Sequence, residues 1–109
     1  MALRFDIVID QGSDYQVTFP VVFPDPGDDL TGWSARSGVR RTPSDSTVLY
    51  DFTPQLFLAG TDVRLTVPAA VSSVWAWTSS DYDLELVAPS GAVTRLVEGH
   101  VIVRPEVTR

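Results

Sequence analysis

The chain has 109 residues, which suits one domain, residues 1–109, with a single hydrophobic core. It has no Cys, which excludes disulfides and thiolate chemistry, and its net charge of −6 argues against binding to nucleic acid, because phosphate backbones are bound by basic groups. No apolar run is long enough to span a bilayer and the first residues include acidic ones, so we expect no membrane contact and synthesis in a cytoplasm.

Apolar and polar residues alternate with a period of two along the first half of the chain, which is typical of half-buried strands. The pattern predicts strands over residues 3–10, 15–23 and 33–40. Pro20 and Pro24 place the second of these at a sheet edge, because proline cannot donate to a hydrogen-bond ladder.

The second half continues the same pattern with one interruption. Further strands are predicted over residues 48–52, 62–67, 82–86, 92–97 and 101–103. The exception is the stretch 68–76, where Pro68 can occupy a first helical position and the two following alanines favour helix. We therefore expect one short helical crossover there.

Seven or eight short strands separated by turns indicate an all-β sandwich or a small barrel. Tyr82, two residues before Leu84, resembles the tyrosine corner of immunoglobulin-like (Ig-like) domains, and Trp33 on the third strand fits the same plan. These features favour an Ig-like antiparallel β-sandwich. The predicted core residues are Trp33, Tyr82, Leu84, Leu86 and Leu96.

The register of the last hairpin is predicted from its charges. With Leu84 opposite Leu96 in the core, Glu85 lies opposite Arg95 on the outside, whereas a slip of one residue would place Arg95 against Leu84. The favourable charge pair selects the first register.

Four valines then fall on outer faces, where a free monomer usually carries polar residues. They are Val8, Val22, Val93 and Val97. Contiguous apolar surface marks a contact region, so these positions are candidate interface residues. The alternative is that they are isolated apolar residues, which are common on protein surfaces.

Candidate catalytic groups are few, and we predict no enzyme. His100 is the only histidine, and neither a Gly-x-Ser-x-Gly motif nor a Cys accompanies it. Asp81, Asp83 and Glu85 alternate along one strand, which indicates a solvated strand face and not the two carboxylates across a cleft that glycoside hydrolysis uses.

Two further groups have a binding and a structural interpretation. Asp25, Asp28 and Asp29 could hold Ca²⁺, but they lack the spacing of a dedicated calcium loop and are predicted to form a turn, so no metal or cofactor is expected. Trp75 and Trp77 could pack in the core, anchor a protein interface or, with Tyr82, stack on sugar rings.

Five strings in chain order carry a family resemblance. They are Asp10–Tyr15, Asp29–Arg36, Tyr82–Leu86, Pro89–Gly91 with Arg95–Gly99, and Val103–Arg109. Together they resemble the small β-sandwich proteins of tailed bacteriophages and prophages, especially those of actinobacteria. The set is similar to the collar proteins that attach side tail fibres in siphophages.

The resemblance implies a non-enzymatic virion component that forms a homo-oligomer on the tail, baseplate or neck and docks fibre or tail proteins. Two alternatives stay open. One is a carbohydrate-binding module that contacts host cell-wall glycan through Trp75, Trp77 and Tyr82. The other is a head decoration or head–tail completion protein.

Overall fold

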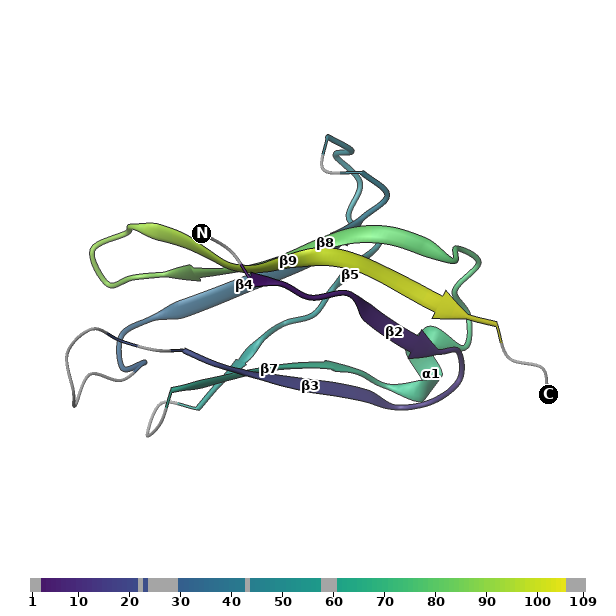
Figure 1. Ribbon diagram of the computed structural model, residues 1–109, viewed down its shortest axis with the longest axis horizontal. Coiled ribbons are helices and arrows are strands. Elements are labelled where there is room, and N and C mark those ends of the chain that lie inside the picture. The colour runs from purple at the N-terminus through teal and green to yellow at the C-terminus, as the bar shows by residue number, and fades with distance from the viewer. Residues whose placement is uncertain (1–2, 22, 24–29, 43, 58–60, 106–109) are drawn as a thin grey trace.

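Two β-sheets, of six and three strands, pack face to face in the computed structural model (Figure 1). The structure describes residues 3–21, 23, 30–42, 44–57 and 61–105. Within these ranges the only helix is α1 (Ala69–Ser72), which lies inside the predicted crossover. The predicted all-β sandwich with one short helix is therefore confirmed.

The larger sheet combines strands from both ends of the chain with two strands from its middle. Its strands are β1 (Leu3–Arg4), β2 (Ile7–Asp10), β4 (Ser34–Arg40), β5 (Tyr50–Asp51), β8 (Ser79–Val87) and β9 (Val93–Arg104). Their order is β1-β9-β8-β4-β5, and β2 also pairs with β9. We expected an antiparallel sandwich, but both β1 and β2 run parallel to β9.

The smaller sheet has the order β3-β7-β6, with β3 (Tyr15–Pro20), β7 (Asp62–Val67) and β6 (Gln55–Leu56). Thus β3 is an edge strand, as its prolines predicted, while the two-residue β6 was missed. The order β3-β7-β6 corresponds to strands B-E-D of an Ig sandwich, and the order β9-β8-β4 in the larger sheet corresponds to strands G-F-C. In the constant-type Ig domain a first strand lies beside strand B, whereas here both N-terminal strands pair with β9.

One core lies between the sheets, built from alternate residues of facing strands. Its buried apolar residues are Ile7, Ile9, Phe19, Val21, Leu30, Val39, Phe52, Val63, Leu65, Val67, Tyr82, Leu84, Leu86, Val97, Val101 and Val103. Of the predicted core set, Tyr82, Leu84 and Leu86 are buried, and Trp33 and Leu96 are partly buried against this cluster. The period-two pattern therefore identified these inward-facing residues of β8 correctly.

A β-bulge changes the register of the last hairpin. Glu85 pairs with Arg95 as predicted, but Leu84 pairs with Val97, so Leu96 is the extra residue on β9. An inserted residue reverses the faces on either side of it. Val97 consequently points inward and is 0% exposed, which makes its predicted place on the outer face wrong. The predicted strands 92–97 and 101–103 are one long strand.

The turn between β2 and β3 is hydrogen-bonded to the segment that contains α1. The Gln11 side-chain amide donates to the carbonyls of Ser73 and Trp75, and the Gly12 N–H donates to the Ser72 hydroxyl. The Asp14 carboxylate accepts the Ala69 N–H. These bonds satisfy backbone groups of a helix too short to be stable alone.

The N-terminal segment crosses β9 at very short range between β1 and β2. The Phe5 N–H donates to the Glu98 carbonyl at 3.0 Å, and the Asp6 carboxylate accepts the His100 N–H at 2.9 Å. The Tyr82 hydroxyl donates to the Phe5 carbonyl, and not to a nearby upstream residue as in a tyrosine corner. A Cβ at Gly99 would lie 2.3 Å from that carbonyl oxygen, so only glycine permits this approach.

Gly99→Ala should therefore lower the free energy of unfolding by about 1–3 kcal/mol or more, because the added methyl group overlaps the backbone of Phe5. Gly38→Ala is the matched control, since its Cβ would meet its nearest neighbour at 3.6 Å, an ordinary contact. Urea unfolding followed by tryptophan fluorescence measures both variants. Equal stability of the two would contradict the close approach at Gly99.

Candidate functional site

Charged side chains form rows across three strands on the outer face of the larger sheet. Three acids lie on the middle strand, β8, and two of them have a basic residue opposite on both neighbouring strands. The two complete rows are Arg36–Glu85–Arg95 and Arg40–Asp81–His100. The acidic stretch predicted as a solvated strand face is thus half-buried; Asp81 and Glu85 have a basic residue opposite them on both sides, whereas Asp83 lies between Gly38 and Glu98.

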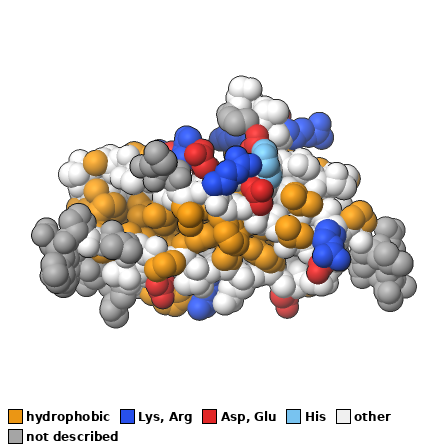
Figure 2. All heavy atoms as spheres, in the orientation of Figure 1, with side chains coloured by type: hydrophobic (Ala, Val, Ile, Leu, Met, Phe, Trp, Pro, Cys, Tyr) orange, Lys and Arg blue, Asp and Glu red, His pale blue; other side chains and the backbone are white. Residues whose placement is uncertain are grey.

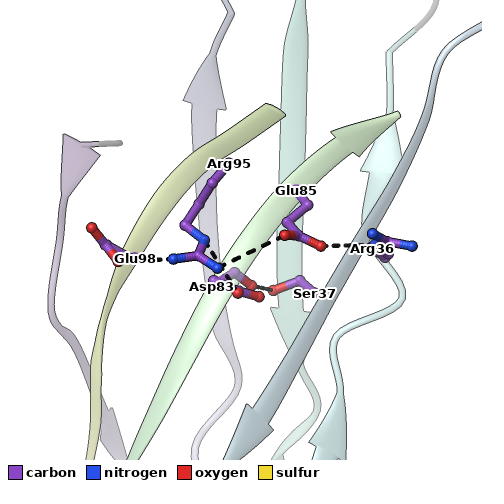
Figure 3. A network of polar contacts seen from close by, with 6 residues as sticks. All are labelled: Arg36, Ser37, Asp83, Glu85, Arg95 and Glu98. Atoms are coloured by element: carbon purple, nitrogen blue, oxygen red, sulfur yellow. Dashed lines mark hydrogen bonds and ion pairs between the residues drawn. The ribbon is translucent and has the colours of Figure 1, made fainter. Parts of the chain in front are cut away.

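Arg95 lies at the centre of one network (Figure 3). Its guanidinium faces Asp83 at 3.5 Å, Glu98 at 3.4 Å and Glu85 at 4.0 Å. On the other side of β8, Arg36 Nε lies 2.8 Å from Glu85 Oε1. Exposed pairs of this kind contribute only about 0–1 kcal/mol each, so they select the strand register more than they stabilise the fold.

His100 belongs to the second row. Its Nδ1 lies 2.5 Å from Asp81 Oδ1, and its backbone N–H is bonded to Asp6. The nearby hydroxyls are committed: Ser37 donates to the Asp83 carbonyl and Tyr82 to the Phe5 carbonyl. Neither of these two hydroxyls is therefore free to be activated by the Asp81–His100 pair.

A hollow of about 690 Å³ lies over these rows. Its acidic and basic lining residues are Arg4, Arg36, Arg40, Asp51, Asp81, Asp83, Glu85, Arg95, Glu98 and His100. Burial, followed by the negative charge of Glu85, raises the pKa of Asp83 above its ordinary value, although Arg95 opposes the shift. Since most of these groups pair with one another, an entering ion has to compete with existing pairs.

The predicted interface residues are not brought together. Val8 and Val93 are 45% and 48% exposed, on β2 and on the far end of β9 respectively. Val97 is in the core, and Val22 lies outside the described residues. The four valines therefore do not form one patch.

The aromatic candidates pack largely against the protein itself. The rings of Trp75 and Trp77 lie 4.6 Å apart, Tyr50 contacts Trp75 edge-on at 5.5 Å, and both tryptophans pack against the core. Tyr82 is 4% exposed and cannot stack on a sugar ring. Of the proposed three-ring platform, only the half-buried Trp75 and Trp77 reach the surface.

The predicted turn at Asp25, Asp28 and Asp29 lies outside the described residues. In the part of the chain that the structure describes, no three acidic, His or Cys residues gather as a metal site would require. No helix found there has the length and apolar character needed to cross a membrane.

Among the described residues, the outer edge of β3 pairs with no other strand; the prolines predicted this edge position, but the sequence did not show which backbone groups it leaves unpaired. Val21, one residue beyond β3, donates its N–H to the carbonyl of Thr61, its partner in the β3–β7 register. Since bonded pairs alternate in an antiparallel ladder, the odd-numbered residues of β3 bond to β7. The backbone groups of Gln16, Thr18 and Pro20 therefore point away from the sheet, and we call these groups the β3 edge.

Apolar side chains surround the β3 edge. A band of hydrophobic side chains runs along the molecule between its two layers (Figure 2). Phe5, from the segment between β1 and β2, packs edge-on against Phe19 of β3 at 5.3 Å and is still 37% exposed. Tyr15 and Val17 of β3 are only partly buried. No residue of β3 is charged, whereas edge strands commonly carry charges that prevent pairing.

Comparison with known proteins gives no family for this chain: no protein-family model matches it, and no curated protein matches it.

Asp83→Asn should raise the free energy of unfolding at pH 7 by a few tenths of a kcal/mol. A carboxyl whose pKa is raised on folding binds its proton more tightly in the folded state, so it contributes less stability as the pH rises from its unfolded pKa through its folded pKa. The amide removes that cost. Glu85→Gln is the control and should lower stability, since Glu85 faces two arginines. Urea unfolding of both variants at pH 7 and pH 4 measures the effect, and a destabilised Asp83→Asn protein would contradict it.

Proposed function

We propose that this protein is a non-enzymatic structural subunit of the virion of a tailed bacteriophage or prophage. In this proposal it assembles as a homo-oligomer on the tail, baseplate or neck and docks fibre or tail proteins. The observation that carries the assembly role is the uncharged β3 edge beside exposed apolar side chains. The resemblance of the five strings supports the virion as the place of assembly.

The charged hollow supports the non-enzymatic part of the proposal. Catalysis at an Asp–His pair requires a group to activate, and the hydroxyls of Ser37 and Tyr82 are buried and bonded to backbone carbonyls. The carboxylates around Arg95 share that one guanidinium on an open sheet face. They do not face each other across a cleft that could enclose a sugar ring.

A glycan-binding role has weaker support. Stacking on sugar requires an aromatic face directed to solvent, whereas Trp75 contacts both Trp77 and Tyr50 and Tyr82 is in the core. The head decoration or head–tail completion alternative would use the same assembly surfaces as a position on the tail. The location of the protein on the particle therefore distinguishes these two alternatives.

The virion proposal is tested on particles released by the host that carries the gene. Particles purified by density gradient should contain the protein in a fixed ratio to the major capsid protein, measured by mass spectrometry. Gold-labelled antibody should mark the tail, baseplate or neck, and labelling of the capsid would instead support the head decoration alternative. A non-structural protein of the same phage is the control for carry-over. Abundance in the lysate with absence from the particles would contradict the proposal.

A further inference from the structure

We propose that the β3 edge is a dimerisation site, at which β3 of a second copy of this chain pairs antiparallel with it. The inference rests on the proposed assembly role and names the surface and the partner. In the resulting dimer the two three-stranded sheets become one six-stranded sheet. A twofold axis crosses the joint, as in most homodimers.

The backbone groups of β3 fit this pairing. With Val17 opposite its own copy on the twofold axis, Gln16 of each chain lies opposite Thr18 of the other, and these are the residues whose N–H and C=O groups point outward. The arrangement makes about four hydrogen bonds between the copies. Pro20, which has no N–H, falls at the two ends of the joint, where its missing donor costs one bond at each end.

The side chains of β3 also fit a second copy. The net charge of −6 repels like molecules, but Tyr15 to Pro20 contains no charged residue, so copies approach along this strand with the least repulsion. Gln16 and Thr18 are exposed and would be cross-strand neighbours that can share a hydrogen bond. Phe5, still partly exposed above Phe19, lies where the second copy would cover it.

The chain's own N-terminal strands leave this place open. Both β1 and β2 pair with β9 in the other sheet, so among the described residues β7 is the only strand that pairs with β3. In the constant-type Ig arrangement a first strand of the same chain takes the corresponding position. Here a strand of another copy supplies the missing hydrogen-bond partners.

Sedimentation velocity across a concentration series tests the proposal on the full chain. The wild-type protein should approach twice the monomer mass of 11.9 kDa as its concentration rises. Thr18→Pro should raise the dimer dissociation constant about tenfold or more, because it removes an outward N–H from each copy. The fold should survive, since a proline is tolerated where the N–H faces solvent on an edge strand.

A second pair of variants keeps the test independent of proline. Thr18→Asp places two carboxylates about 7–8 Å apart across the twofold axis and should also weaken the dimer. Thr66→Asp is its matched control, because Thr66 is exposed on the same face but lies on the middle strand β7, opposite Gln16. Thr66→Asp should dimerise like the wild type.

Either of two results would overturn the inference. One is a wild-type protein that stays monomeric over a 100-fold range of concentration that reaches its solubility limit. The other is a dimer whose dissociation constant is unchanged by Thr18→Pro and by Thr18→Asp. A monomeric protein that is nevertheless found in purified particles would remove the dimer and leave the virion role standing. A dimer absent from particles would do the reverse.

Discussion

The close approach of the N-terminal segment to β9 at Gly99 determines which sheet the first two strands join. The Phe5 carbonyl occupies the space that a Cβ of residue 99 would fill, and the Tyr82 hydroxyl and the Asp6 carboxylate hold the segment from two sides. These bonds fix β1 and β2 in the larger sheet, parallel to β9. As a consequence neither of them pairs with β3, whose outer edge has no strand partner among the described residues, and the assembly role proposed for this protein depends on that edge.

The charged face has a different role. Its acids and bases alternate across β4, β8 and β9, and each row is satisfied only when the three strands are in one register. The pair between Glu85 and Arg95 holds on one side of the bulge, while Leu84 and Val97 meet in the core on the other. The charges therefore specify the alignment of the long strands.

Local patterns predicted much of the fold. Alternation identified the inward faces of β2, β7 and β8, and Pro20 identified β3 as an edge strand. Both signals can be read from a few consecutive residues of the sequence. The parallel pairing of β1 and β2 with β9 depends on Phe5 and Gly99, which are distant in sequence. The bulge at Leu96 also has no local signal, so Val97 was assigned to the wrong face.

The candidate site was harder to predict than the fold. His100 and Asp81 were separate candidates in the sequence, and they form a row with Arg40 only when three strands pair. Pro20 indicated an edge strand, but which backbone groups of β3 point away from β7 depends on the register of the β3–β7 ladder, which the side-chain pattern does not encode. Surface valines suggested a contact region, but Val8 and Val93 lie apart and the surface that emerged is made of backbone groups.

Amide hydrogen exchange, read residue by residue by NMR at low and at high protein concentration, tests most directly whether the protein works through this edge. At low concentration the amides of Gln16 and Thr18 should exchange rapidly while those of Val17 and Phe19, which face β7, are protected. At high concentration Gln16 and Thr18 should become protected as well. Exchange of these two amides at the same rate at both concentrations would contradict the account.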